Sequence, residues 1–242
     1  MWVTAYYHST SLFSLRPALS TASGAQSLLV PTPYAIKMAL VDVAIRCYGV
    51  GSGEQWWPAI RDLEIALDLP DRLVVNKTFI KIQRPTRVTK SNPEEVEAAK
   101  ATGVYPMGPT IAFREFVQFD GALGIALRSN ELVDIPTAEL LTLINYVGKR
   151  GSFFQLQQPP EQQEELNQRY IILTQPAESF PANGTLQVLD DCGDKLTWEQ
   201  VNVFTSKPIS LNIHERVLRT VVLPYKLQRS SYRYTLYTRL IK

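Results

Sequence analysis

Residues 72–90 read RLVVNKTFIKIQRPTRVTK and give the clearest indication of the fold. Apolar and polar residues alternate from 73 to 82, as is typical of a β-strand. The stretch holds six basic residues and no carboxylate, although the formal net charge of the whole protein is only +2. Such a strand could follow a polyanion backbone, or it could be a solvated edge strand whose lysines prevent edge-to-edge pairing. The run by itself leaves both interpretations open.

The segment that follows this strand has no regular periodicity. Residues 84–112 contain several prolines and glycines around a short charged piece, 94–100. So long an excursion from a compact domain usually has a function or is disordered. Strand patterns resume at 111–119 and 122–127, separated by an Asp-Gly pair that predicts a tight turn.

A helix is predicted upstream of the basic strand. Thr32 is a suitable N-cap, Pro33 occupies the first position of the helix, and Gly49 is suited to end it. The apolar face recurs at helical spacing through Ile36, Leu40, Val43 and Cys47. The glycine-rich run 49–53 predicts a flexible connector, and a short helix is expected from about 56 to 67.

The order of these elements predicts the fold class. A second helix is expected at 136–147, and strands are expected at 2–10 and 152–157. Strand, helix, strand, long insertion, strand, helix and strand follow one another, which is the β-α-β-β-α-β pattern of a ferredoxin-like domain. We therefore expect an α+β protein with this domain at 1–157.

The remainder, residues 158–242, is expected to be a smaller β-rich region after a linker rich in Gln, Glu and Pro. The strands expected there span 170–174, 185–189, 200–204, 216–224 and 231–240. Charge is segregated: residues 155–200 are mainly acidic, and the segment after Thr205 is basic. If this second basic zone meets the first in space, the two form one cationic face, while the acidic zone could contact a basic partner protein.

Several classes of protein are not expected. The two cysteines, Cys47 and Cys192, are too few for a disulfide framework, and no His/Cys/carboxylate spacing indicates a metal site. We expect no cofactor. The N-terminus lacks a signal-peptide pattern, and the apolar stretch 28–48 is interrupted by prolines and charges, so neither a membrane span nor a membrane partner is expected. A cytoplasmic location follows as an expectation.

Three features could hold an anion. The helix start at 27–37 offers backbone N–H groups beside Lys37, but a plain capped core helix fits as well. The turn 148–151, GKRG, holds Lys149 and Arg150 between glycines, where an ordinary helix stop is the alternative. The basic strand and its excursion are the third. Phe153 and Phe154 follow the turn; one could stack on a base, or both could be core residues.

The opening strand, the helix start LVPTPYAIKMAL at 29–40 and the turn GKRGSF at 148–153 resemble the Cas5 family of CRISPR-associated RAMP proteins. The resemblance covers about residues 1–157 and implies a ferredoxin-like (RRM-like) domain with a thumb hairpin inserted at about 84–112. It implies a subunit of a type I Cascade complex that binds the 5′ handle of the crRNA, the Cas7 backbone subunit and a large Cas8-type subunit. Target DNA would be met only through the assembled complex. The candidate RNA contacts that follow are Lys37, Arg84, Arg87, Lys90, Lys149 and Arg150.

The resemblance leaves catalysis open, because a subset of Cas5 proteins cleaves precursor RNA. Metal-free RNA cleavage needs a general base, and His8 lies beside Tyr6 and Tyr7 on the opening strand. Alternation places His8 and Tyr6 on one face and Tyr7 on the other, which favours a structural or RNA-contacting His8. We expect a non-catalytic RNA-binding subunit. The alternatives are a metal-independent endoribonuclease acting on CRISPR precursor RNA and a ferredoxin-like protein-interaction module unrelated to RNA.

Overall fold

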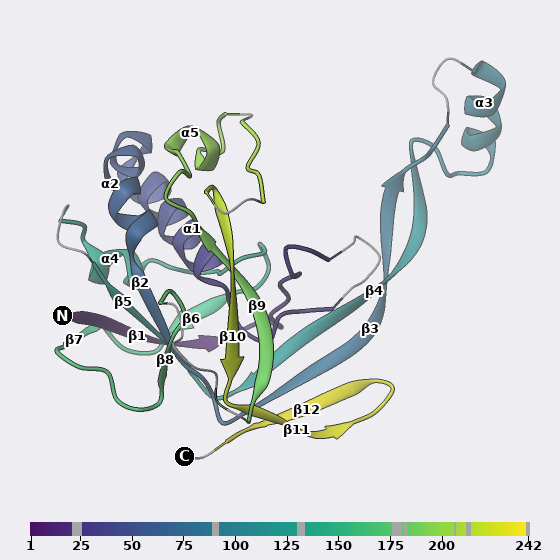
Figure 1. Cartoon of the computed structure of the whole chain (residues 1–242). Helices are drawn as coiled ribbons and strands as arrows, with labels where there is room; N and C mark the ends of the chain where they lie inside the picture. The colour runs from purple at the N-terminus through teal and green to yellow at the C-terminus, as the bar shows by residue number, and fades with distance from the viewer. Residues whose placement is uncertain are drawn as a thin grey trace.

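The structure is a computed structural model of the 242-residue chain, and it describes residues 1–20, 26–88, 92–129, 134–175, 181, 183–205, 207–211 and 214–240. The protein is α+β, with antiparallel sheets and few helices (Figure 1). The first sheet is formed by β1 (Trp2–Ser9), β2 (Glu64–Asp68), β5 (Leu123–Arg128), β6 (Phe154–Leu156), β7 (Glu161–Gln163) and β8 (Tyr170–Ile172). Its strand order is β6-β1-β5-β2-β8, and β7 pairs with β1.

A second sheet contains the basic strand. It has the order β11-β12-β3-β4 and consists of β11 (Tyr225–Ser230), β12 (Tyr234–Arg239), β3 (Arg72–Pro85) and β4 (Met107–Asp120). β3 and β4 form one long hairpin that is paired continuously from Arg72 opposite Asp120 to Pro85 opposite Met107. The hairpin projects away from the rest of the molecule and carries α3 (Pro93–Ala101) at its far end (Figure 1).

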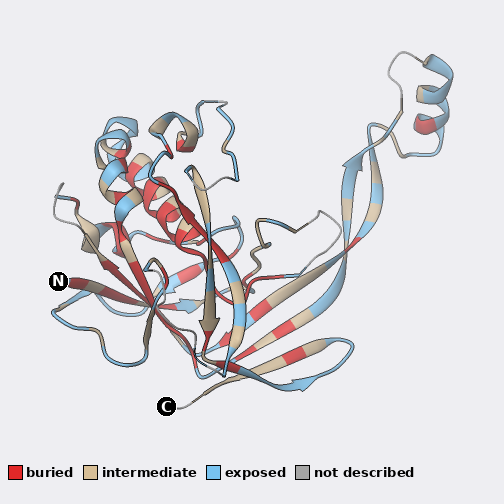
Figure 2. Cartoon of the chain, in the orientation of Figure 1, coloured by how far each residue is buried: buried red, intermediate tan, exposed pale blue. Residues whose placement is uncertain are grey.

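The helices other than α3 lie on one side of the first sheet and cover its core face (Figure 1). They are α1 (Pro33–Val43), a π-helical turn (Ala44–Tyr48), α2 (Val50–Asp62), α4 (Thr137–Thr142) and α5 (Trp198–Val201). Thr32 caps α1 as predicted, since its hydroxyl accepts a hydrogen bond from the Ala35 N–H at 3.1 Å. Tyr7 on β1 and Ile36 on α1 both belong to the main buried core. Figure 2 shows the buried residues of the helices and the sheet in red. In the part of the chain that the structure describes, no helix is long and apolar enough to cross a membrane.

The C-terminal part of the chain is interleaved with the N-terminal part. β8 pairs with β2, and β12 pairs with β3. The two-stranded ribbon of β9 (Thr185–Cys192) and β10 (Arg216–Leu223) lies against α1 and contributes Leu189 to the main core. The division into domains at 1–157 and 158–242 stays a prediction.

Three local predictions were wrong. The glycine run 49–53 is not a connector: α2 starts at Val50, and Gly53 packs so closely on Trp198 that a Cβ there would lie 2.8 Å from the ring. The helix expected to end near 67 ends at Asp62, because the next residues form β2. The strand expected at 200–204 is replaced by the short helix α5, which a capping box at Thr197 begins.

The second helix is shorter than predicted. α4 ends at Thr142 rather than near 147, although Leu140 and Leu141 are buried as its periodicity indicates. Tyr146 and Phe153 instead pair in an isolated β-bridge. The chain therefore turns back toward the sheet before a longer helix can form.

Candidate nucleic-acid interface

The outer half of the β3–β4 hairpin exposes large apolar side chains. Near the body, one face of the hairpin is buried through Leu73 and Val117. Farther out the same face continues through Phe79, Phe113, Ile111 and Met107, which are 54%, 54%, 64% and 42% exposed. The rings of Phe79 and Phe113 lie opposite each other with centroids 3.9 Å apart. We call these four residues the apolar hairpin patch; Figure 2 shows how exposure increases along the hairpin.

The basic side chains of the outer part of β3 are exposed, including the candidate RNA contact Arg84. Lys77 and Lys81 lie on the same face as the apolar hairpin patch, whereas Arg84 lies on the opposite face, across from Gly108. Arg87 follows the strand and is exposed. Lys90 lies outside the described residues. At the base of the hairpin, Arg72 is paired with Asp120 at 2.6 Å.

The turn at 148–151 has the geometry that its glycines predict. Gly148 and Gly151 have φ angles of 78° and 104°, which side-chain-bearing residues rarely adopt. Lys149 and Arg150 are held between them and are exposed. A hydrogen bond to the Tyr146 side chain raises the pKa of Arg150.

The two phenylalanines after the turn have different environments. Phe154 is buried and packs edge-on against Phe13 at a centroid distance of 6.3 Å. Phe153 is 49% exposed. Phe153 is thus the one of the two whose ring is free to stack on a base.

Residues 11–15 join the 148–151 turn to the hairpin. The Ser11 hydroxyl donates to the Gly151 carbonyl at 2.6 Å, and Phe13 exchanges two backbone hydrogen bonds with Val117 on β4. Lys149 and Arg150 are therefore fixed to the same scaffold as the inner end of β4. Arg84 lies near the outer end of the β3–β4 pairing, opposite Gly108, and Arg87 follows the end of β3.

Lys37 is located differently from the other candidates. Its ammonium is buried and lies 2.7 Å from the Asp191 carboxylate, which also accepts a hydrogen bond from Arg219 Nε at 3.1 Å. The ammonium faces this carboxylate and not solvent, so a contact with RNA would require the ion pair to open. Asp191 is 154 positions away, and the sequence around Lys37 contains no signal for it.

The residues considered for catalysis are dispersed. His8 is exposed on β1. The Tyr6 hydroxyl donates to Asp68 at 3.4 Å, and the Tyr7 hydroxyl donates to the Leu141 carbonyl at 2.7 Å inside the core. Burial raises the pKa of Tyr7, so this phenol stays protonated. These contacts give the two tyrosines structural roles; the absence of catalysis stays a prediction.

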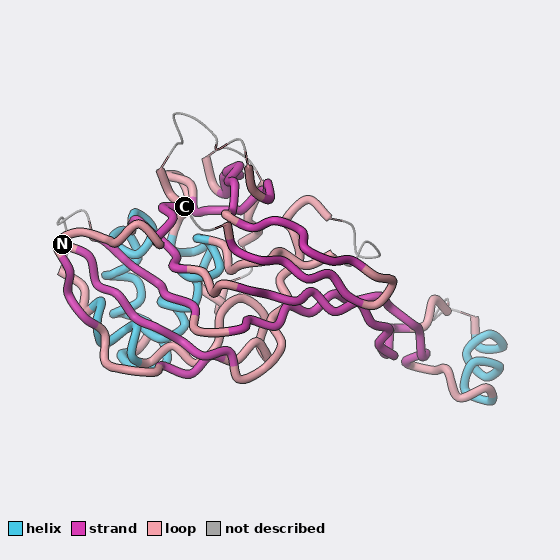
Figure 3. Tube along the Cα trace, turned by 90° about the horizontal axis from the view of Figure 1, so that it is seen from below, coloured by secondary structure: helices cyan, strands magenta, loops and turns pink. Residues whose placement is uncertain are grey.

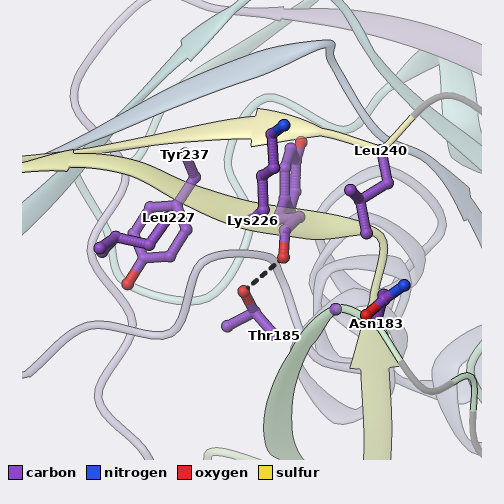
Figure 4. Close-up of a pocket in the computed structure, with 8 residues that line it drawn as sticks. Asn183, Thr185, Lys226, Leu227, Tyr237 and Leu240 are labelled. Atoms are coloured by element: carbon purple, nitrogen blue, oxygen red, sulfur yellow. Dashed lines mark hydrogen bonds between the residues drawn. The ribbon is translucent and has the colours of Figure 1, made fainter.

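A hollow of about 610 Å³ lies where β11 and β12 meet the start of β9. Figure 4 shows Leu227 and Tyr237 on one side of it and Thr185 on the other; the Thr185 hydroxyl donates to the Tyr225 carbonyl at 2.7 Å. Lys226 is the charged residue of its lining, and its ammonium points away from Thr185. Among the described residues that line the hollow there is no carboxylate and no histidine.

The chain is similar to known proteins along most of its length. No family model matches. A curated protein named CRISPR-associated protein Cas5, from Archaeoglobus fulgidus, is 26% identical over 226 residues, which cover 89% of this chain and 90% of that protein. A crystal structure of a CRISPR protein from Archaeoglobus fulgidus superposes with a TM-score of 0.41 and 14% identity, covering 99% of this chain and 92% of the other. A chain of a CRISPR RNA-guided surveillance complex superposes with a TM-score of 0.46 and 15% sequence identity, and the match covers 92% of this chain and 90% of the other. The family resemblance found in the sequence motifs is confirmed: this chain is a homologue of a Cas5 protein along most of its length.

Proposed function

We propose that this chain is the non-catalytic RNA-binding subunit of a type I CRISPR Cascade complex. In that role it holds the 5′ handle of the crRNA and caps the Cas7 backbone next to a large Cas8-type subunit. The observation that carries the proposal is the projecting β3–β4 hairpin, which exposes cations and large apolar side chains together. The Cas5 homologue supports the assignment to a CRISPR system.

The fold detail of the proposal is a ferredoxin-like domain with a thumb. The strand order β6-β1-β5-β2, with antiparallel neighbours, supports the ferredoxin-like part. The β3–β4 hairpin is inserted between β2 and β5, which supports its assignment as the thumb.

In this proposal the RNA is held at the base and along the hairpin. Arg84 and Arg87 on the hairpin, and Lys149 and Arg150 at the turn, neutralise phosphates, and Phe153 offers a ring for an unstacked base. Phosphate contacts fix the register of the strand without reading its sequence. Recognition of target DNA is then left to base pairing by the guide.

The apolar hairpin patch is assigned to protein contact with the Cas7 backbone. Four large apolar side chains on one face of a projecting hairpin are costly to leave in water, and such patches mark protein interfaces. Lys77 and Lys81 border the patch, so a partner surface with an acidic rim fits it best.

The RNA contacts are tested by the salt dependence of binding. The Kd for a handle-bearing crRNA is measured by fluorescence anisotropy over a range of NaCl concentrations, for the wild type and for the double variant Arg84→Gln/Arg87→Gln. Log K, where K is the association constant, falls as log[NaCl] rises, and we call the steepness of this fall the salt slope. Loss of two phosphate contacts makes the salt slope smaller by about 1.4. The matched control, Lys195→Gln/Lys207→Gln, removes two exposed cations elsewhere. Equal effects of both double variants would reject the assignment of Arg84 and Arg87.

The absence of catalysis is a separate part of the proposal. Purified protein incubated with precursor CRISPR RNA in EDTA is expected to leave the RNA intact. Specific cleavage that is lost in a His8→Ala variant would establish the endoribonuclease alternative. The interaction-module alternative instead predicts that the protein has no salt-dependent affinity for RNA.

A further inference from the structure

The two basic zones of the sequence meet in the second sheet. β12 pairs with β3 from Tyr234 opposite Asn76 to Thr238 opposite Arg72, and β11 lies on the other side of β12. The basic C-terminal segment is thereby built onto the edge of the basic strand, and the order β11-β12-β3-β4 forms one continuous surface.

Alternation along the strands separates the two faces of this sheet. Leu73, Val75, Val117 and Thr235 are buried, so their side chains point toward the core. Their neighbours point the other way. We call this second face the outer sheet face. By the pairing register its members include Lys226, Arg229, Tyr234, Leu236, Thr238, Arg72, Val74, Asn76, Arg114, Phe116, Gln118 and Asp120. Figure 3, which looks at the molecule from below, shows the strands in front and the helices behind them.

The outer sheet face carries mainly positive charge. Among the described residues of its strands, Asp120 is the one carboxylate on this face, and it is paired with Arg72 at 2.6 Å. Arg114, Lys226 and Arg229 take part in no ion pair between described residues. A surface that carries several uncompensated cations attracts a polyanion.

The other groups on this face suit bases better than a protein. Tyr234 and Phe116 are half-buried and lie on either side of Asn76, which is opposite both of them in the pairing register; Gln118 lies two residues beyond Phe116 on β4. The strongly exposed apolar side chains of the hairpin, such as Phe113, lie on the opposite face. Single-stranded nucleic acid is bound by cations along its backbone and aromatic rings under its bases, and side-chain amides can bond a 2′-hydroxyl.

We infer that the outer sheet face binds single-stranded RNA, with the C-terminal hairpin of β11 and β12 supplying phosphate contacts through Lys226 and Arg229 and a stacking ring through Tyr234. This inference rests on the proposed function and adds a second set of contacts to it. The RNA that leaves the β3–β4 hairpin continues over the sheet, and Arg114 lies between the two regions.

Salt-dependent anisotropy with a handle-bearing single-stranded RNA tests the inference in the full chain. Lys226→Gln/Arg229→Gln is expected to lower the salt slope by about 1.4, as two lost phosphate contacts require. Lys195→Gln/Lys207→Gln is the control with the same change in charge. Tyr234→Ala is expected to weaken binding by roughly 5- to 150-fold, whereas Tyr234→Phe retains the ring and the affinity. Circular dichroism melts verify that each variant is folded.

The outcomes separate the inference from the function on which it rests. If the wild type binds no RNA, both are overturned. If Arg84→Gln/Arg87→Gln lowers the slope but Lys226→Gln/Arg229→Gln matches its control, the proposed function stands and the outer sheet face is not an RNA surface.

Discussion

The buried pair of Lys37 and Asp191 allows a sharp test, because substitutions there should lower the stability of the protein without changing its RNA binding. The two side chains are 3% and 2% exposed, and 2.7 Å separates Lys37 Nζ from Asp191 Oδ1. Asp191 has two further donors, the Cys192 N–H at 2.8 Å and Arg219 Nε at 3.1 Å. Lys37 has no second acceptor among the described residues. Loss of the partner's charge should therefore cost more stability when Asp191 is replaced than when Lys37 is replaced.

This inequality sets the expected magnitudes. Asp191→Asn leaves a buried ammonium without its counter-charge and is expected to lower the free energy of unfolding by about 3–5 kcal/mol. Lys37→Met leaves Asp191 with two of its three donors, and about 1–3 kcal/mol is expected. Glu97→Gln is the control: it breaks the exposed pair with Lys100 and should leave the urea midpoint nearly unchanged.

Urea unfolding measures all three variants, with an unchanged m-value showing that the midpoint shift reports stability. At a temperature where Lys37→Met is folded, its salt slope for RNA should equal that of the wild type. Costs below 1 kcal/mol for both core variants would contradict the buried pair. A slope lowered by about 0.7 would show instead that Lys37 contacts a phosphate.

Four more predictions each concern one or two side chains. Thr32→Ala removes the cap of α1 and should lower stability by about 1 kcal/mol in the same urea assay; no change would show that the cap is dispensable. A thiol reagent should modify exposed Cys47 quickly and Cys192 only on unfolding, so two fast thiols would contradict the packing. Burial raises the pKa of Cys192 from 9.0 to about 12, so its contribution to stability is complete below pH 9.0 and is lost as the pH rises toward 12; urea midpoints of wild type and Cys192→Ala over this range test the sign. If the apolar hairpin patch contacts Cas7 as proposed, Phe113→Ser should abolish co-purification with Cas7 while leaving the urea midpoint nearly unchanged, and retained co-purification would contradict that assignment of the patch.

Local signals in the sequence predicted local structure well. Thr32, Pro33 and Gly49 located the first helix, and the glycines of the 148–151 turn located a turn with two positive φ angles. In each case the deciding interaction lies within a few residues of the signal. The first helix and the 148–151 turn could therefore be predicted from the sequence alone.

Features set by distant partners were not predictable in the same way. Residues 64–68 became β2 because β5 and β8 pair with them from both sides, and neither partner lies nearby in the sequence. Lys37 carries the pattern of an anion contact, and Asp191 on β9 decides its environment. The charge pattern anticipated one cationic face only on the condition that the basic zones meet; the pairing of β12 with β3 satisfies that condition.

The pairing of β12 with β3 also affects how the protein can be made. Tyr234 lies opposite Asn76, about 160 residues earlier in the chain. At ribosomal rates of 5–20 residues per second, the edge of β3 is therefore without this neighbour for roughly 8–30 s. An unpaired edge strand is a template for association with other chains, and the charges at Lys77 and Lys81 oppose such association. The same lysines that border the apolar hairpin patch in the finished protein can thus protect the nascent chain from aggregation.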